Sequence, residues 1–444
     1  MTRKTLHIGF DDIDSPRGRC TTHFGSIIVE KLDALEVEWL DYPNLIRLNP
    51  NIPYRTRGNG SIALRFKTEE KHIDSIQNIL QKAIEEYIDE EYLNTNPGIV
   101  LVKGEVPSML VALSKRALWR VIPITFVRRL IEELEVDVHA YGNKRGLIGA
   151  LSAIGNQLFD DYTYEFIAYR SQEDHSRDRG VEPKSVRKMD KKMDNTVFSN
   201  IDRRTGRVLI APHGPDPVVY GVRGENAVDT VTAGKMVQST PNRERWLLFR
   251  TNQGTGEHLQ HRVEIENLRP YMAATVFCEV KSKPEMIEGG HAIFQVSDAT
   301  GTIDCAAYEP TGDFRKTVLK LIPGDKLILH SGIRPASRTH GMTVNVEGME
   351  VIELAEKAKY HNPICPECSR RMTSAGRNKG YKCKNCGFRA RDGKKIKEVI
   401  PRELSKKLYL PPLRAQRHLT RPHARVGKQN SGRPSELIKK WHMP

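Results

Sequence analysis

Two C-x-x-C motifs near the end of the chain constrain its folding more than any other feature. Cys365 and Cys368 bound the first motif, Cys383 and Cys386 bound the second, and fourteen residues separate the two. This spacing is typical of a structural zinc ribbon, in which two knuckles supply four thiolates to one Zn²⁺ ion. Disulfides are the alternative, but paired knuckles favour metal in a reducing cytosol. The sequence therefore predicts a zinc ribbon over residues 361–395.

Basic residues are concentrated in the same part of the chain. Residues 361–444 hold 22 Lys and Arg against 5 Asp and Glu, a net charge of +17, whereas the whole chain carries +15. Lys and Arg bind polyanions by releasing counterions from phosphate backbones. We therefore expect the ribbon and a basic tail at 396–444 to bind nucleic acid. A solvated tail that only adds solubility is the alternative.

The length of the chain and its hydropathy limit the class of protein. A chain of 444 residues is too long for one hydrophobic core. No run approaches the ~18 apolar residues of a membrane span. The N-terminal MTRKTLHIGF leads directly into a strand-like segment, without a signal peptide. We expect a cytoplasmic protein of several domains with no membrane partner.

The pattern between residues 273 and 355 is that of a small barrel. Five short strand-like segments occur there, with one helical segment after the third, which is the order of an OB-fold. The strands are expected at 274–281, 291–298, 301–310, 324–333 and 342–352, and the helix at 314–322. OB-folds often bind single-stranded nucleic acid. Residues 231–272, just before the barrel, are expected to be a linker.

The N-terminal half mixes strand and helix patterns, as in an α+β fold. Residues 4–10 predict a buried strand, and Phe24, Ile28 and Leu32 mark one face of a helix that begins at Thr21. The charged stretch at 171–194 predicts a mobile loop.

Between that strand and that helix, the stretch GFDDIDSPRGRCTTH carries Asp11, Asp12 and Asp14. Several carboxylates at a strand end can hold a hard cation such as Mg²⁺, which bridges nucleotide phosphates and relieves the repulsion between like charges. The alternative is a tight turn rich in Asp and Ser, with Thr21 or Thr22 serving only as the helix N-cap.

Two further loops carry residues that could contact a phosphate group. Arg57 and Asn59 lie in YRTRGNGS, and Lys144 and Gly146 lie in YGNKRGLIGA. The second segment has a strand, a Gly-rich turn and a helix, so that its backbone can approach a phosphate, although it matches neither a Walker nor a GxGxxG motif. Ordinary solvent contact of exposed side chains is the alternative.

Six segments, taken together and in order, resemble the archaeal agmatinylcytidine synthetases, which modify the wobble cytidine of the AUA-decoding isoleucine tRNA. These segments are GFDDIDSPRGRCTTH, LIRLNPNIPYRTRGNGS, YGNKRGLIGALSAIG, IAPHGPDPVVYGVRGE, LFRTNQGTGEHL and PPLRAQRHLTRP. The resemblance spans nearly the whole chain. It implies a multidomain α+β fold with a split kinase-like catalytic domain at 1–61 and 136–230. An inserted ferredoxin-like domain at 62–135, an OB-fold at 273–355 and a zinc ribbon complete that expectation.

The same resemblance implies an ATP-dependent ligase that joins agmatine to tRNA. ATP, Mg²⁺ and Zn²⁺ are the implied cofactors, with the Asp cluster holding Mg²⁺ and with Thr21 phosphorylated by ATP. The chain departs from the family at Ile13, where a threonine usually stands, and this removes a possible hydroxyl ligand.

The implied reaction also predicts a site for the guanidinium group of agmatine. Replacing the cytosine ring oxygen by an amine requires that oxygen to leave, and phosphorylation makes it a leaving group. A carboxylate is the natural partner of a guanidinium. Asp160, Asp161 and Glu165 are the candidates, with helix capping or solvation as the alternative.

Two other classes of protein fit part of the sequence. A non-catalytic protein that binds single-stranded nucleic acid would combine an OB-fold, a zinc ribbon and a basic tail, but would leave the Asp cluster without a role. Another ATP-dependent RNA-modifying enzyme would use the Asp cluster but would have no need for agmatine.

Overall fold

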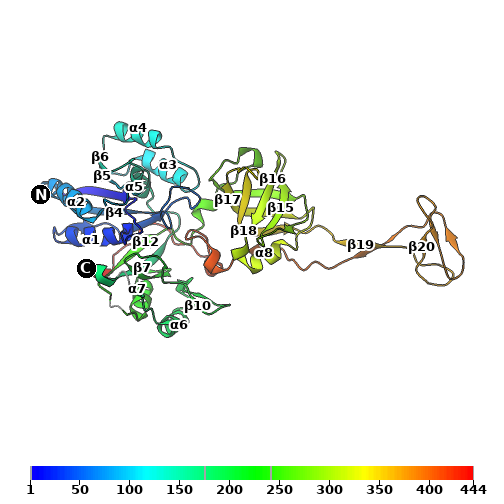
Figure 1. Cartoon of the computed structure of the whole chain (residues 1–444). Helices are drawn as coiled ribbons and strands as arrows, with labels where there is room; N and C mark the ends of the chain where they lie inside the picture. The colour runs from blue at the N-terminus through cyan, green and yellow to red at the C-terminus, as the bar shows by residue number, and fades with distance from the viewer. Residues whose placement is uncertain (1–2, 175–176, 241–242, 444) are drawn as a thin grey trace.

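The computed structural model describes residues 3–174, 177–240 and 243–443. Figure 1 shows three parts in a row: a large α/β part, a β-barrel, and a small cysteine-rich unit at the end of a long arm. Both termini lie at the large part. No helix in the described ranges is long and apolar enough to cross a bilayer.

One large sheet forms the frame of the α/β part. Its main path runs β6-β5-β1-β4-β3-β12-β7-β11-β8, with β2 paired to β4 and β25 paired to β12. The strands are β1 (Arg3–Asp11), β2 (Glu38–Trp39), β3 (Asn44–Arg47), β4 (Gly60–Glu69), β5 (Gly98–Lys103), β6 (Asp137–Ala140), β7 (Thr163–Tyr169), β8 (Val197–Phe198), β11 (Val218–Gly224), β12 (Arg245–Thr251) and β25 (His442–Met443).

The first strand lies inside the sheet and confirms the buried strand predicted for residues 4–10. β1 pairs antiparallel with β4 on one side and with β5 on the other. Both neighbours come almost entirely from residues 62–135, which were expected to form an inserted ferredoxin-like domain. This range is therefore continuous with the N-terminal sheet rather than a separate unit, because removing it would expose both edges of β1.

Strand β12 joins the two halves of the sheet. It runs parallel to β3 and antiparallel to β7. Leu247, Leu248 and Phe249 of this strand are at most 1% exposed. The strand belongs to residues 231–272, which were expected to be a linker, so that expectation is corrected: this apolar run is buried as a central strand.

Helices pack on this sheet and complete its core. They are α1 (Thr21–Asp33), α2 (Ile73–Tyr87), α3 (Ser108–Ala117), α4 (Ile124–Leu134), α5 (Gly146–Gly155), α6 (Pro183–Lys192) and α7 (Ala227–Met236). The rings of Phe10 and Phe24, from β1 and α1, meet edge to face at 5.2 Å. Helix α6 lies where a mobile loop was predicted. It forms because Val186 and Met189, three residues apart, are both fully buried.

The barrel follows the predicted OB-fold order. Its strands are β13 (Ala273–Val280), β14 (Glu285–Met286), β15 (Ala292–Ser297), β16 (Thr302–Ala307), β17 (Lys326–Arg334) and β18 (Thr343–Glu353), with β24 (Leu408–Tyr409) added at β18. The pairing of β13 with β15 closes the barrel. Helix α8 (Asp313–Val318) follows the third long strand, as predicted.

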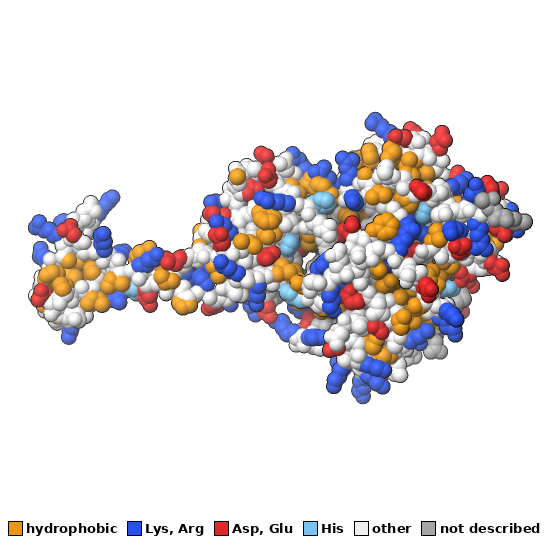
Figure 2. All heavy atoms as spheres, turned by 180° about the vertical axis from the view of Figure 1, so that it is seen from behind, with side chains coloured by type: hydrophobic (Ala, Val, Ile, Leu, Met, Phe, Trp, Pro, Cys, Tyr) orange, Lys and Arg blue, Asp and Glu red, His pale blue; other side chains and the backbone are white. Residues whose placement is uncertain are grey.

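A two-stranded arm carries the cysteine-rich unit away from the barrel. The arm pairs β19 (Ala358–His361) with β23 (Ile396–Val399). The unit holds β20 (Thr373–Ser374), β21 (Tyr381–Lys382) and β22 (Arg389–Ala390). Figure 2 shows the arm and the unit standing clear of the rest, with Lys and Arg side chains along both.

The C-terminal segment is the largest departure from expectation. Residues 396–444 were predicted to be a basic tail that binds nucleic acid. After the arm, the chain instead returns to the α/β part, where β25 pairs with β12 (Figure 1). Trp441 is 5% exposed and packs edge to face against Trp39 and Tyr42. The apolar side chain and the strand pairing make this segment part of the large core.

The remaining elements are short. They are the hairpin of β9 (Ile201–Asp202) and β10 (Arg207–Val208), and the 3₁₀ turns at Glu70–His72, Gln172–Asp174, Glu257–Leu259, Ile265–Asn267, Glu309–Thr311, Leu413–Ala415 and His423–Arg425.

Candidate active site

The Asp-rich loop connects the end of β1 to the start of α1. Asp14 Oδ1 accepts a hydrogen bond from the Thr21 backbone N–H at 3.0 Å, and Asp14 Oδ2 accepts one from the Thr56 hydroxyl at 3.1 Å. The Thr21 hydroxyl accepts the Ile13 backbone N–H at 3.3 Å. Cys20 occupies the N-cap position of α1, so neither threonine is the N-cap, although the loop does form a tight turn, with the Ser15 N–H bonded to the Arg19 carbonyl.

The other two carboxylates of the cluster face a different set of partners. Asp12 has a left-handed backbone, with φ at 59°, and its Oδ2 accepts the Asn96 backbone N–H at 3.1 Å. Asp11 lies against α5: a Cβ on Gly149 would be 1.8 Å from Asp11 Oδ2, so only glycine lets the helix pass there. The loop therefore divides the cluster, with Asp14 on one side and Asp11 and Asp12 on the other.

Burial and crowding change the acidity of this second pair. Desolvation raises the pKa of Asp11 well above its usual range, and the neighbouring Asp12 carboxylate adds to the rise. Desolvation also raises the pKa of Asp12 to about 6, against the effect of the hydrogen bonds from Asn96. A bound cation would relieve both costs, because it stabilises the ionised form.

Loop 48–59 packs over the Asp14 side of the cluster. Arg57 donates to the Arg19 carbonyl at 3.0 Å, and its Nη1 lies 3.7 Å from both Asp14 and Asp216. Asn59 instead donates to the Asn49 carbonyl at 2.8 Å, which holds the loop closed. The backbones of Arg57 and Asn59 both adopt the left-handed conformation, which is strained and is often found at functional sites.

A pocket of about 590 Å³ opens beside Asp14, Thr21 and Thr22. Six arginines and three carboxylates line it, together with His213 and His418. The charged lining residues are Asp14, Arg47, Arg57, Glu165, Arg207, Asp216, Arg223, Arg414 and Arg417. This volume is within the range for small-molecule sites, and the arginines suit phosphate groups.

Of the residues predicted for the site, Asp14, Thr21, Arg57 and Glu165 line this pocket. Asp11, Asp12, Asn59, Lys144, Gly146, Asp160 and Asp161 do not. Lys144 is exposed on the loop before α5, on the side of Asp12. The Gly146 backbone N–H donates to the Asn96 carbonyl at 3.0 Å, so this amide already has a partner within the protein.

Glu165 lies in the wall of the pocket on β7. Its Oε1 accepts from Arg223 Nε at 3.2 Å, its Oε2 accepts from the Gln253 amide, and Arg47 Nη2 lies 4.0 Å away. His418 Nδ1 lies 2.7 Å from Arg223 Nη2. Enclosure by the protein and the guanidinium groups of Arg47 and Arg223 keep the pKa of His418 well below its usual range.

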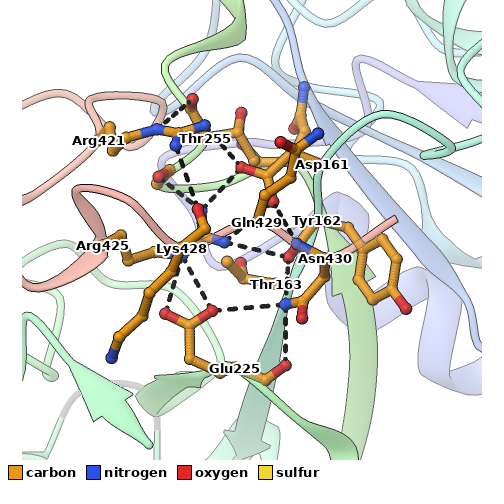
Figure 3. Close-up of polar contacts among 12 residues, drawn as sticks. Asp161, Tyr162, Thr163, Glu225, Thr255, Arg421, Arg425, Lys428, Gln429 and Asn430 are labelled. Carbon is orange, nitrogen blue, oxygen red and sulfur yellow. Dashed lines mark hydrogen bonds and ion pairs between the residues drawn. The ribbon is translucent and has the colours of Figure 1, made fainter. Parts of the chain in front are cut away.

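Asp160 and Asp161 are placed differently from Glu165. Asp160 is exposed, whereas the carboxylate of Asp161 is buried and occupied by Arg421, Arg425 and the Asn430 backbone (Figure 3). Two guanidinium groups of the chain itself therefore fill the place that a guanidinium ligand would take at Asp161.

Sequence reasoning missed four of the pocket residues that hold this geometry. Arg47, Asp216, Arg223 and His418 lie in LIRLNP, APHGPDP, YGVRGE and RAQRHLT. These stretches belong to the segments that carry the family resemblance. The signal was present, but no local pattern distinguishes a buried arginine in a pocket wall from an arginine in solvent.

The four cysteines of the small unit converge as predicted. Cys365 Sγ lies 3.4 Å from Cys386 Sγ, Cys368 Sγ lies 3.4 Å from Cys383 Sγ, and all four sulfur atoms lie within 4.8 Å of one another. Backbone N–H groups of Cys386 and Asn385 lower the pKa of Cys383 to about 6, which favours its thiolate. In the described ranges this is the only group of three or more His, Cys, Asp or Glu ligands that is so compact. The site matches tetrahedral Zn²⁺.

Family models match three stretches of the chain. The TiaS TCKD domain matches residues 7–143, the TiaS FLD domain matches 144–258, and the TiaS C-terminal zinc ribbon domain matches 362–404. TiaS of Staphylothermus marinus, an isoleucine tRNA 2-agmatinylcytidine synthetase, is 42% identical to the chain, over 98% of the chain and 97% of the relative. The chain belongs to the TiaS family.

Other TiaS proteins agree over the same length. TiaS of Thermococcus sibiricus is 39% identical over 94% of the chain and 95% of its own length. A crystal structure of TiaS in complex with an isoleucine tRNA and ATP is 34% identical, with a TM-score of 0.85, over 97% of this chain and 99% of that chain. A second complex, of TiaS with an isoleucine tRNA, AMPCPP and agmatine, is 31% identical, with a TM-score of 0.82, over 97% of this chain and 99% of that chain.

The TiaS models also divide the α/β part differently from the expected boundaries. They meet between residues 143 and 144, in the loop just before α5, whereas the sequence analysis placed boundaries at 61/62 and 135/136. The α+β fold, the OB-like barrel and the four-cysteine zinc ribbon of the TiaS family are confirmed.

Proposed function

We propose that this TiaS protein joins agmatine to the wobble cytidine of the AUA-decoding isoleucine tRNA at the expense of ATP. The observation that carries the proposal is the pocket that brings Asp14 and Thr21 together with arginines and Glu165, in a chain that matches TiaS over its length. Both TiaS complexes described above contain an isoleucine tRNA, one with ATP and the other with AMPCPP and agmatine.

The reaction replaces one bond at the cytosine ring carbon between the two ring nitrogens. A phosphoryl group derived from ATP is transferred to the ring oxygen and gives a phosphate ester. The primary amine of agmatine then attacks the carbon, and the carbon–oxygen bond breaks. The phosphate leaves with the former ring oxygen, and the attacking nitrogen loses its proton. The cytidine must leave its base stack to enter the pocket, as is usual for enzymes that modify a base.

Within the pocket we assign roles by position. The Thr21 hydroxyl is the acceptor of a phosphoryl group from ATP, because it stands at the start of α1 beside Asp14. Arg57 holds phosphate on the pocket side. Asn59 contributes through the shape of the loop, because its amide is used within the protein. On the side of Asp12, the exposed Lys144 is the proposed neighbour of the ATP phosphates, and Gly146 contributes through the shape of the turn, because its amide is used within the protein.

Magnesium fits the carboxylates on that second side. Asp11 and Asp12 would hold it, because they are adjacent at the end of β1 and a bound cation would offset the burial that raises both of their pKa values. In the described part of the chain the three carboxylates are not among the compact ligand groups, which suits Mg²⁺ bound by one or two carboxylates and by substrate phosphates. The ion would neutralise charge on the transferred phosphoryl group.

Glu165 is the proposed partner of the agmatine guanidinium. Of the three candidates it alone lines the pocket, and a carboxylate has about four acceptor positions, of which Arg223 and Gln253 use two. Asp161 is occupied by Arg421 and Arg425.

The remaining parts serve the tRNA. We propose that the two halves of the large sheet act together as the kinase-like catalytic unit, and that the barrel, the arm and the zinc ribbon bind the tRNA backbone with their basic side chains. We place the protein in the cytoplasm, where ATP and tRNA are available.

The test is to incubate the protein with ATP, agmatine and the AUA-decoding isoleucine tRNA, and to measure the mass of its nucleosides. Loss of the wobble cytidine and appearance of agmatinylcytidine is the expected result, and omission of ATP or of agmatine should abolish it. An unmodified cytidine with a folded, zinc-loaded protein would refute the proposal.

A further inference from the structure

The returning C-terminal segment holds one arginine whose setting differs from that of a surface contact. Arg425 is fully buried, in the turn Pro422–Arg425 that follows the pocket residues 413–418. Its Nη2 and Nη1 donate to Asp161 Oδ1 and Oδ2 at 3.0 and 3.2 Å, and its Nε donates to Glu225 Oε1 at 2.9 Å (Figure 3). One guanidinium thus joins the start of β7 to the end of β11.

The Asp161 carboxylate also binds the chain before and after Arg425. Arg421 Nη2 donates to Asp161 Oδ2 at 2.8 Å, and the Asn430 backbone N–H donates to Asp161 Oδ1 at 3.0 Å. The Asn430 amide also donates to the Tyr162 carbonyl at 2.8 Å and the Glu225 carbonyl at 3.0 Å. Residues 421–430 therefore form a closed clasp on Asp161 and Glu225.

The clasp is linked to the pocket wall through the turn after β12. The Gly254 N–H donates to the His418 carbonyl at 2.9 Å, and the Gly256 N–H donates to the Leu419 carbonyl at 2.7 Å. Arg425 Nη1 donates to the Gly254 carbonyl at 2.8 Å, so it touches the strand of chain that holds His418. The position of Arg425 thereby fixes the position of His418 in the pocket wall.

His418 in turn touches the residue that orients the proposed agmatine ligand. Its Nδ1 lies 2.7 Å from Arg223 Nη2, and Arg223 Nε donates to Glu165. On the other side, a Cβ on Gly58 would lie 2.7 Å from His418 Cδ2 and 2.7 Å from Arg47 Nη1, so the loop, His418 and Arg47 are in close contact. A displacement of the C-terminal segment would therefore move Arg223, Arg47 and the loop that carries Arg57.

We propose that Arg425 is a positioning residue for the agmatine ligation: it seats residues 413–419 so that His418 holds Arg223 against Glu165. This inference rests on the proposed location of the reaction in this pocket. The inference gives the C-terminal segment a role in the pocket of the α/β part, although the charge of this segment alone suggested binding of nucleic acid. The zinc ribbon lies between the barrel and this segment in sequence, so the pocket is complete only when the chain has returned.

The test compares Arg425→Gln with Arg433→Gln, a matched change in the same segment. Arg433 is exposed and donates to the Gln157 side chain, outside the clasp. Steady-state kinetics with agmatine are measured well below the melting temperature, with tRNA affinity and zinc content alongside. We expect Arg425→Gln to lower kcat/KM for agmatine on the order of a hundredfold, as displaced catalytic groups do. Arg433→Gln should leave kcat/KM, tRNA affinity and zinc content unchanged.

A double-mutant cycle with His418→Ala separates positioning from stability. If Arg425 acts through His418, the two changes should be strongly non-additive in kcat/KM, whereas independent effects would add. Where Arg425→Gln does not fold, Glu225→Gln, which removes one arm of the clasp, takes its place in the same cycle. A variant that only melts earlier, or additive effects, would overturn the inference. If His418→Ala were also without effect, the proposed location of the reaction would fall as well.

Discussion

Arg425 donates to both carboxylate oxygens of Asp161, and the side chains lie 0% and 5% exposed. A buried guanidinium with such partners does not leave to admit a ligand, because its removal would strand a charge in the protein interior. The three acidic candidates for agmatine are therefore unequal: Asp161 is structural, Asp160 is in solvent, and Glu165 faces the pocket.

Glu165→Gln should weaken agmatine binding while the protein still folds. Loss of a hydrogen-bonded charge partner costs about 1.5–3 kcal/mol, which corresponds to roughly a 10- to 100-fold rise in KM for agmatine. Asp160→Asn is the matched control and should leave KM unchanged. A KM that rises with Asp160→Asn and not with Glu165→Gln would reverse the assignment.

Asp12 makes metal-free stability depend on pH. Its pKa is raised from 3.8 to about 6 in the folded protein, so the folded state holds this proton more tightly than the unfolded state. The stabilisation by the proton is complete below the lower value and is lost as the pH rises through about 6, by roughly 3 kcal/mol. Asp12→Asn should therefore unfold at higher urea than the wild type at neutral pH.

Urea unfolding of both metal-free proteins across this pH range checks that sign. The stability difference between Asp12→Asn and the wild type should grow from acid to neutral pH and shrink when Mg²⁺ is added, because Mg²⁺ stabilises the carboxylate. A difference that is constant with pH would contradict the account.

Zinc should matter for the ribbon and for tRNA, and not for the pocket. Cys383→Ser removes one of four thiolates and should reduce bound zinc from one equivalent to nearly none, because structural sites need all four ligands. We expect weaker tRNA binding and an unchanged affinity for agmatine. Ser374→Ala, in the same unit, is the control. Metal analysis that still finds one equivalent in Cys383→Ser would exclude the site.

The C-terminal segment should contribute to the stability of the whole α/β part. Trp441→Ala removes a buried ring from between Trp39 and Tyr42 and should lower the free energy of unfolding by about 3–5 kcal/mol. Met443→Ala, at a side chain that is 39% exposed, should cost far less. Equal and small effects in urea unfolding would mean that the segment is not part of the core.

Local patterns in the sequence predicted the elements that depend on near neighbours. The ribbon follows from Cys365, Cys368, Cys383 and Cys386 because metal geometry requires that spacing. The barrel order follows from alternating apolar residues and one helical segment, and β1 and α1 follow from their apolar spacing. Each of these features is set within a few tens of residues.

Contacts between distant segments could not be predicted from such local patterns. Arg425 and Asp161 are 264 residues apart, and nothing in ARVGK marks that arginine as buried rather than bound to RNA. The division of the Asp cluster depends on Asn96 reaching Asp12 and Thr56 reaching Asp14, which only the folded loops reveal. The segment is basic, as its composition shows, but it packs on the α/β part and does not form a free tail.

The acceptor role of Thr21 is the central claim about the chemistry. Thr21 is the first residue of α1 and not its N-cap, so Thr21→Val loses one hydrogen bond from the Ile13 N–H, at a cost of about 1 kcal/mol, and should fold. Thr22→Val is the control, because Thr22 lines the same pocket one residue later. Only Thr21→Val should fail to take up label from γ-phosphate-labelled ATP.

Peptide mass spectrometry of the wild-type protein after treatment with ATP tests this most directly. We predict one phosphate, on Thr21, and none in Thr21→Val, which should also fail to join agmatine to tRNA while binding both. Phosphate on Thr22 or elsewhere, or an unphosphorylated protein that still joins agmatine to tRNA, would contradict the account.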